Sequence, residues 1–139
     1  MNLSEKALGI KPSSTLSITE KAGLLRKEGK NVISFSIGEP DFDTPEHIKK
    51  AAIDAINEGF TRYTAAAGIV ELRQAVADKL KKDNGLDYDY TQIVISNGAK
   101  HSLINALMAV LNPGDEVIIP APYWLSYAEM VRIAGGTPV

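Results

Sequence analysis

The sequence has 139 residues, of which 45% are hydrophobic and 23% charged, and its formal net charge is −2. These values are ordinary for a folded domain, or for part of a larger one. The near balance of charges argues against a nucleic-acid partner, which calls for an excess of Lys and Arg. The absence of cysteine excludes disulfides and thiol nucleophiles.

Two further classes of protein are disfavoured, those that bind zinc and those that enter a membrane. The histidines His47 and His101 are far apart in sequence, which argues against a zinc site, and we expect no bound metal. No apolar run approaches the roughly 20 residues of a membrane helix, and the N-terminus lacks the apolar stretch of a signal peptide. We therefore expect a cytoplasmic protein with no membrane partner.

The first part of the chain predicts two helices and a strand. Ser17–Glu20 has the Ser-x-x-Glu pattern of a capping box, which predicts a short helix that ends near Gly29. Residues 32–36 predict a strand. Thr44 is expected to cap the next helix, which Gly59 ends.

The middle of the chain predicts a helix, a strand and a turn. The helix is expected to begin at Gly68 and to end at Gly85, with apolar residues at helical spacing. Ile93–Ile95 predicts a short strand because it is apolar and β-branched. Ser96–Lys100 is then expected to turn the chain into another helix.

The last part continues the alternation of strands and helices. We expect a strand over 116–120, a helix over 125–134, and the start of a further strand at 137–139. Apolar strands that alternate with helices indicate an α/β fold with a parallel sheet covered on both faces. Such a short sheet leaves an unpaired edge, so we expect the chain to be the N-terminal part of a larger polypeptide.

Candidate ligand sites lie where strands end, because open α/β sheets bind ligands beyond the carboxyl ends of their strands. The turn Ser96–Lys100 can hold a phosphate at the start of its helix, although a plain turn would need Gly98 just as much. It has neither a P-loop nor a dinucleotide-binding pattern. Trp124 follows the next strand and offers a flat ring, yet a lone tryptophan usually only packs. The loop Gly38–Phe42 offers a glycine amide to a carboxylate.

Several segments rich in glycine, proline and aromatic residues follow one another in an order far more specific than any one of them. They are Gly38–Pro45, Arg62–Thr64 with Gly68–Arg73, Ser96–Lys100, Asn112–Val117 and Pro122–Trp124. Together they resemble the class I/II pyridoxal-phosphate (PLP) aminotransferases and, within them, the bacterial aspartate aminotransferases. The resemblance extends from about residue 11 to residue 139.

The resemblance implies an incomplete α/β fold of the type I transferase kind. Residues 1–43 are expected to form the N-terminal arm, helix and loop, as part of the small domain and active-site lid. Residues 44–139 are expected to form the first part of the PLP-binding large domain. The implied reaction converts L-aspartate and 2-oxoglutarate to oxaloacetate and L-glutamate, by a ping-pong mechanism through a PLP aldimine. Amino acids and 2-oxo acids are the implied substrates.

The matching positions also imply roles in cofactor binding. Gly98, Ala99 and Lys100 match the turn that holds the cofactor phosphate, chiefly through main-chain N–H groups. Trp124 matches the aromatic residue that stacks on the pyridine ring and helps to position the substrate.

Two other positions imply contacts with the substrate and with a second subunit. Gly38 matches a glycine whose backbone lies by the substrate α-carboxylate. Tyr63 matches a tyrosine that reaches the cofactor phosphate of the neighbouring subunit, which implies a homodimer. The family often has proline near Ala65 and at Val70, so their absence puts the rigidity of the loop around Tyr63 in doubt.

The resemblance also places essential groups outside this sequence. The lysine that forms the Schiff base is expected beyond Val139, so we assign no catalytic residue here and expect the isolated chain to be inactive. His101 is expected to lie behind the site or at the surface and not to act as a catalytic base. Two alternatives stay open: an aromatic or broad-specificity PLP aminotransferase, and a non-catalytic fragment for phosphate binding or dimerisation.

Overall fold

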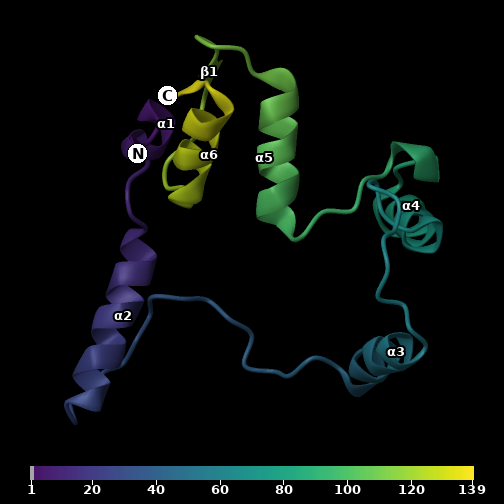
Figure 1. The fold of residues 1–139 in the computed structure, drawn as a ribbon, viewed down its shortest axis with the longest axis horizontal. Helices are drawn as coiled ribbons and strands as arrows, with labels where there is room; N and C mark the ends of the chain where they lie inside the picture. Colours follow the sequence, from purple (N-terminus) through teal and green to yellow (C-terminus); the bar gives the residue numbers. More distant parts are fainter. Residues whose placement is uncertain (1) are drawn as a thin grey trace. The chain divides into compact units, whose positions relative to one another are not determined.

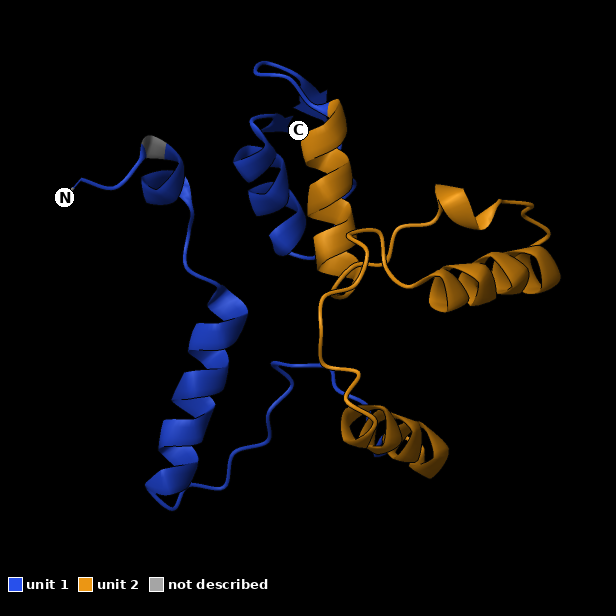
Figure 2. Cartoon of the chain, turned by 45° about the vertical axis from the view of Figure 1, so that its right-hand side comes forward, with its two compact units in different colours: residues 1–44, 111–139 blue, residues 45–110 orange. Residues whose placement is uncertain are grey.

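The structure is a computed structural model, and it describes residues 2–139. The chain divides into two compact units, of which unit 1 comprises Met1–Thr44 and Leu111–Val139 and unit 2 comprises Pro45–Val110 (Figure 2). The predicted division into larger domains, 1–43 and 44–139, stays a prediction. In chain order the elements are α1 (Glu5–Gly9), α2 (Ser14–Lys27), α3 (Glu46–Asn57), α4 (Val70–Asn84), the 3-10 helix η1 (Tyr90–Gln92), α5 (Ala99–Val110), β1 (Glu116–Val117), α6 (Ser126–Ala134) and β2 (Thr137–Pro138) (Figure 1).

Helix α2 begins one turn earlier than predicted. Ser13 is its N-cap, and the Oγ of Ser13 accepts from the amide of Leu16 at 3.4 Å. Ser17 lies inside the helix, where its hydroxyl donates to the Ser14 carbonyl at 2.9 Å. The predicted capping role of Ser17 is therefore wrong, because an upstream serine already satisfies the first amides of the helix.

The segment 32–36 does not form the predicted strand. It follows α2 and is tied back to it by side chains. Thr19 Oγ1 donates to Ser36 Oγ at 2.9 Å, and Arg26 Nε donates to the Val32 carbonyl at 3.2 Å. A strand requires a neighbouring backbone as partner, and no described strand pairs with this segment.

The sheet of unit 1 is small and parallel. Glu116 of β1 faces Thr137 of β2, and Val117 faces Pro138. The ladder continues through the amide of Ile119, which donates to the Val139 carbonyl at 2.8 Å. The expected strand over 116–120 is thus confirmed in its first part, and the expected strand at the C-terminus is confirmed as well.

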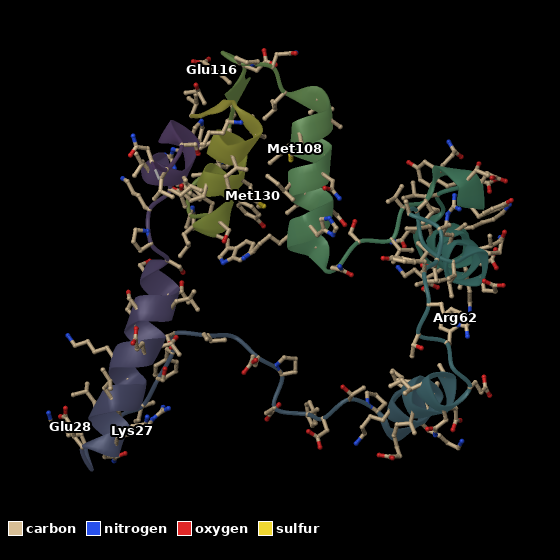
Figure 3. All side chains as sticks on the ribbon, viewed as in Figure 1. Lys27, Glu28, Arg62, Met108, Glu116 and Met130 are labelled. Carbon is tan, nitrogen blue, oxygen red and sulfur yellow. The ribbon has the colours of Figure 1, made fainter. Side chains whose placement is uncertain are left out.

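Most of the buried apolar side chains described in unit 1 lie on α6, and α2 adds Ala22. Ala128, Met130 and Val131 are buried, and Met130 is labelled in Figure 3. The first helix of the chain is joined to the same element, because Lys6 Nζ donates to the Ile133 carbonyl at 3.0 Å. Hence α1 and α6 lie in contact although 127 positions separate these two residues in sequence.

In unit 2, helix α3 starts just after the predicted cap. Pro45 is the flanking residue, and its carbonyl accepts from the amides of Ile48 and Lys49 at 3.0 and 3.2 Å. No side chain caps this helix, so the predicted role of Thr44 as N-cap is wrong. The ring of Pro45 restricts its φ, which is −52° here, and so helps to fix the chain direction before the helix.

Helix α4 packs against the chain that follows it. Its predicted end is confirmed, because Gly85 takes the left-handed conformation with φ +69°. Ile93–Ile95 does not form the predicted strand. It is held instead by Arg73, whose Nε donates to the Ile93 carbonyl at 2.9 Å, and by the amide of Ile95, which donates to the Ala67 carbonyl at 2.9 Å.

Taken together, the helices and the parallel pair form a partial α/β fold, as predicted. Across residues 2–139, every helix is either too short or too polar to cross a lipid bilayer.

Candidate functional site

The turn before α5 is shaped by Gly98. Its φ of +82° lies in the left-handed region, which favours glycine. A Cβ built at this position would meet nothing within 4 Å, and residues 97–101 are exposed. The turn therefore presents its backbone to solvent with no side chain in front of it.

The amides at this turn differ in what they bind. The amide of Gly98 donates to the Ser96 carbonyl at 2.9 Å, and the Gly98 carbonyl accepts from the amide of His101 at 3.1 Å. The amide of Ala99 donates to no group in the described part of the chain. Lys100 follows it in the first turn of α5. An open amide at a helix start, beside a lysine, suits an anion.

The charges around the turn are also compatible with a phosphate. No Asp or Glu occurs in the sequence between Asp89 and Asp115, so α5 and the turn carry no carboxylate. The positive end of the helix dipole is therefore uncompensated by an acidic side chain of its own helix. The turn therefore suits a phosphate group, to which the amide of Ala99 can donate.

His101 has a role at this turn that the sequence did not reveal. Its Nδ1 accepts from the amide of Asn97 at 3.1 Å, across the residues that form the turn. His101 is the third residue of α5, the position that Glu or Gln takes in a capping box. A histidine there does not match that pattern.

Tyr63 lies in the loop between α3 and α4 and is fully exposed. Together with Thr61 and Arg62 it lines a shallow hollow, and Figure 3 shows Arg62 in this loop. The end of the loop is fixed to the segment that leads into the Gly98 turn, because Ala67 accepts from the amide of Ile95. The structure thus links the Tyr63 loop and the turn through one backbone hydrogen bond.

The other two predicted site residues belong to unit 1. Trp124 is 45% exposed and makes an edge-to-face contact with Tyr127, with ring centroids 5.6 Å apart. Gly38 lies in the irregular segment before α3 and is exposed. Tyr63, Gly98, Ala99 and Lys100 all belong to unit 2.

Comparison with known proteins decides the family. Residues 30–139 match the family described as aminotransferase class I and II. The chain belongs to this family. The fold of this aminotransferase chain is also similar to that of aspartate aminotransferases of known structure. It aligns over its whole length with the enzyme of Thermus thermophilus with maleate, at a TM-score of 0.95 and 47% identity. The alignment with the aspartate aminotransferase of Rhizobium meliloti has a TM-score of 0.92 and 49% identity.

Curated aminotransferases are similar over almost the entire chain. The chain is 59% identical over 128 residues to a probable aspartate/prephenate aminotransferase of Rhizobium leguminosarum bv. phaseoli, and 54% identical over 139 residues to an aspartate/prephenate aminotransferase of Nitrosomonas europaea. These alignments cover 92% and 100% of this chain but 32% and 35% of those proteins. In the two solved structures, 36% and 35% of the chain is covered. The aminotransferase chain therefore spans about a third of the length of its relatives.

Proposed function

We propose that this chain is the N-terminal portion of a PLP-dependent enzyme that transfers the amino group of L-aspartate to 2-oxoglutarate. The observation that carries the proposal is the match of residues 30–139 to the aminotransferase family, together with relatives that are named aspartate/prephenate aminotransferases. The exposed turn at the start of α5 supports it independently, because it suits a phosphate.

The cofactor phosphate is assigned to the start of α5. The open amide of Ala99 would donate to it, the bare backbone of Gly98 would permit close approach, and Lys100 would add positive charge. Bound PLP supplies an electron sink, which lets an amino group move from one carbon skeleton to another. This chain's part in that chemistry is to hold and orient the cofactor.

The remaining predicted residues orient the reacting molecules. The proposal gives Trp124 the face of the pyridine ring, because a flat indole is a side chain that stacks on aromatic rings. Gly38 is assigned to the substrate α-carboxylate. Tyr63, which no described group covers, is assigned to the cofactor of a second subunit in a homodimer.

The chain alone is proposed to be inactive. The proposal places the lysine that binds the cofactor, and the carboxylate that keeps the pyridine nitrogen protonated, in the roughly two thirds of the relatives' length that this chain does not span. The lysine would move the proton at the substrate carbon, and the carboxylate would keep the ring an electron sink. The binding surfaces and these two groups would therefore come from different parts of the complete enzyme.

Reduction with borohydride tests this proposal. After addition of PLP and reduction, the complete enzyme should gain the mass of one pyridoxyl group, and it should transaminate aspartate. The 139-residue chain should stay at 15.0 kDa and show no turnover. Cofactor-dependent turnover by the isolated chain would refute its proposed inactivity, and a complete enzyme without an adduct would refute PLP dependence.

A second substrate follows from the names of the relatives. Two of them are named for prephenate as well as aspartate, so prephenate is a candidate amino acceptor beside 2-oxoglutarate. Steady-state rates of the complete enzyme with each acceptor, and with aspartate or phenylalanine as donor, separate the possibilities. A preference for phenylalanine would favour the aromatic aminotransferase alternative.

A further inference from the structure

The turn Ser96–Lys100, to which the proposed function assigns the phosphate, is called the phosphate turn below. Its two sides are joined by a hydrogen bond that is unusual for a helix start. Capping boxes normally pair a Ser or Thr cap with a Glu or Gln at the third helical residue. Here Gly98 precedes the helix and has no side chain to offer, and His101 occupies the third position. The His101 ring accepts from the amide of Asn97 at 3.1 Å and so bridges the turn from one side to the other.

The direction of this hydrogen bond fixes the state of the ring. A backbone amide can only donate, so Nδ1 of His101 must keep its lone pair. The proton of the neutral ring is then on Nε2. The turn is closed by an acceptor that carries no negative charge.

We propose that His101 is a positioning residue that holds the phosphate turn in shape with an uncharged acceptor. The inference rests on the proposed function, since that function assigns the cofactor phosphate to this turn. A glutamate at the same position would close a helix start equally well and would favour the helix dipole. It would also place a negative charge beside a bound phosphate and repel it.

The surroundings support the importance of charge here. The nearest acidic residues in sequence are Asp89 and Asp115, both outside the turn and outside α5. The first turn of α5 contains a lysine and a neutral imidazole acceptor, whereas acidic residues are otherwise favoured at this position. The absence of a carboxylate and the presence of a histidine both keep negative charge away from the turn.

The test compares affinities for PLP and for pyridoxal, which lacks the phosphate, in the complete enzyme. The ratio of the two dissociation constants reports the phosphate contribution alone, because general loss of structure weakens both ligands. His101→Gln keeps a neutral acceptor, His101→Leu removes it, and His101→Glu keeps an acceptor but adds charge. His47→Leu is the matched control, since His47 also lies in the first turn of a helix but its ring bonds to no described group.

The Gln variant and the His47 control should keep the ratio within about twofold of the wild type. The Leu variant should lower the preference for PLP about fivefold, as expected for the loss of one neutral hydrogen bond. The Glu variant should lower it about tenfold or more because of like-charge repulsion. If the Leu variant does not fold, the contrast between Gln and Glu decides.

The outcomes separate the two proposals. A wild-type enzyme that binds pyridoxal as tightly as PLP would overturn the phosphate turn, and with it this part of the proposed function. A wild type that prefers PLP, with Leu or Glu variants that keep the full preference, would overturn the role of His101 alone.

Discussion

Gly68 occupies a position where no other residue would fit without strain. Its φ is +100°, and a Cβ there would lie 2.6 Å from Cγ1 and 2.8 Å from Cβ of Ile95. The Cβ of Ile95 is fixed by the backbone, and its Cγ1 moves only if the side chain changes its χ1 rotamer. Gly68 therefore lets the end of the Tyr63 loop lie directly on the segment that leads to the Gly98 turn.

Gly68→Ala should destabilise the complete enzyme more than Gly59→Ala does. Both positions have positive φ, which costs a side chain about 1–2 kcal/mol, but Gly59 has nothing within 4 Å of the added Cβ. The overlap with Ile95 should add about 1–3 kcal/mol at Gly68. Urea unfolding curves of the two variants provide the difference, and equal losses would show that Ile95 yields without cost.

The carboxyl of Asp89 provides a prediction for pH. The hydroxyl of Thr91 donates to it at 2.5 Å and the amide of Thr91 at 2.8 Å, and these bonds hold the pKa of Asp89 below its ordinary value. Arg73 contributes in the same direction, whereas desolvation opposes it. Since the folded pKa is lowered, the cap on η1 is complete above about pH 4 and is lost as the pH falls through the lowered pKa.

Thr91→Val removes the hydroxyl, the largest cause of the shift, but keeps the amide. The pKa of Asp89 should then rise toward its ordinary value, and the cap should be lost at higher pH. A pH titration of the Asp89 carboxyl carbon by NMR measures this. Thr64→Val, in a different loop, should leave the titration unchanged, and an unchanged titration in Thr91→Val would contradict the assignment of the cause.

At the scale of elements, Arg73 joins α4 to the segment that leads to the Gly98 turn. Its Nε donates to the Ile93 carbonyl, and its guanidinium lies 5.4 Å from the centroid of the Tyr90 ring. A planar guanidinium makes both contacts at once, and a lysine ammonium does not reproduce them. Two residues farther on, the amide of Ile95 bonds to the Tyr63 loop.

Arg73→Lys should therefore loosen this segment without unfolding α4. We expect hydrogen exchange of the Ile95 amide to accelerate about three- to tenfold, because local opening becomes easier. Arg26→Lys is the control, since Arg26 Nε also donates to a backbone carbonyl, that of Val32 in unit 1. Equal acceleration of Ile95 in both variants, or none in Arg73→Lys, would contradict the role given to Arg73.

The elements also show what the sequence could and could not predict. Helices such as α4 and α6 were predictable to within about two residues, because a helix makes its hydrogen bonds within its own segment. The strands predicted at 32–36 and 93–95 did not form. A strand depends on hydrogen bonds to a partner strand, which is often far away in sequence. The strand at 116–120 had such a partner at the C-terminus.

In the candidate site too, some features follow from the local sequence and others do not. Gly98 was predictable from local turn chemistry, because a glycine between a strand-like segment and a helix signals positive φ. The roles of Tyr63, Trp124 and Gly38 followed only from resemblance to a family. The closure of the turn by His101 escaped prediction because it depends on which way a side chain folds back, which spacing alone does not determine.

At the scale of the whole molecule, much apolar surface is uncovered. Ile48, Ile53 and Ile56 of α3 are each half or more exposed. Among the described residues of unit 2, Ala77 is the one buried apolar side chain. Apolar surface left in water forfeits the main stabilising contribution to folding.

The isolated 139-residue chain should therefore lack a cooperative unfolding transition. Calorimetry should show a broad, weak heat change, and a hydrophobic dye should bind strongly to the chain at 25 °C. The complete enzyme, measured in parallel, should give a sharp transition and little dye binding. A sharp transition of the isolated chain would mean that its two units bury enough surface alone.

The hydrogen bond between Lys6 and the Ile133 carbonyl has a consequence for the order of events during synthesis. At about 5–20 residues per second, a ribosome adds Ile133 roughly 6 to 25 seconds after Lys6. Unit 2 is continuous in sequence and is complete once Val110 has emerged, whereas α1 must wait for α6. Among the helices of this chain, α1 is synthesised first, yet its bond to α6 can form only after all of unit 2 has been synthesised.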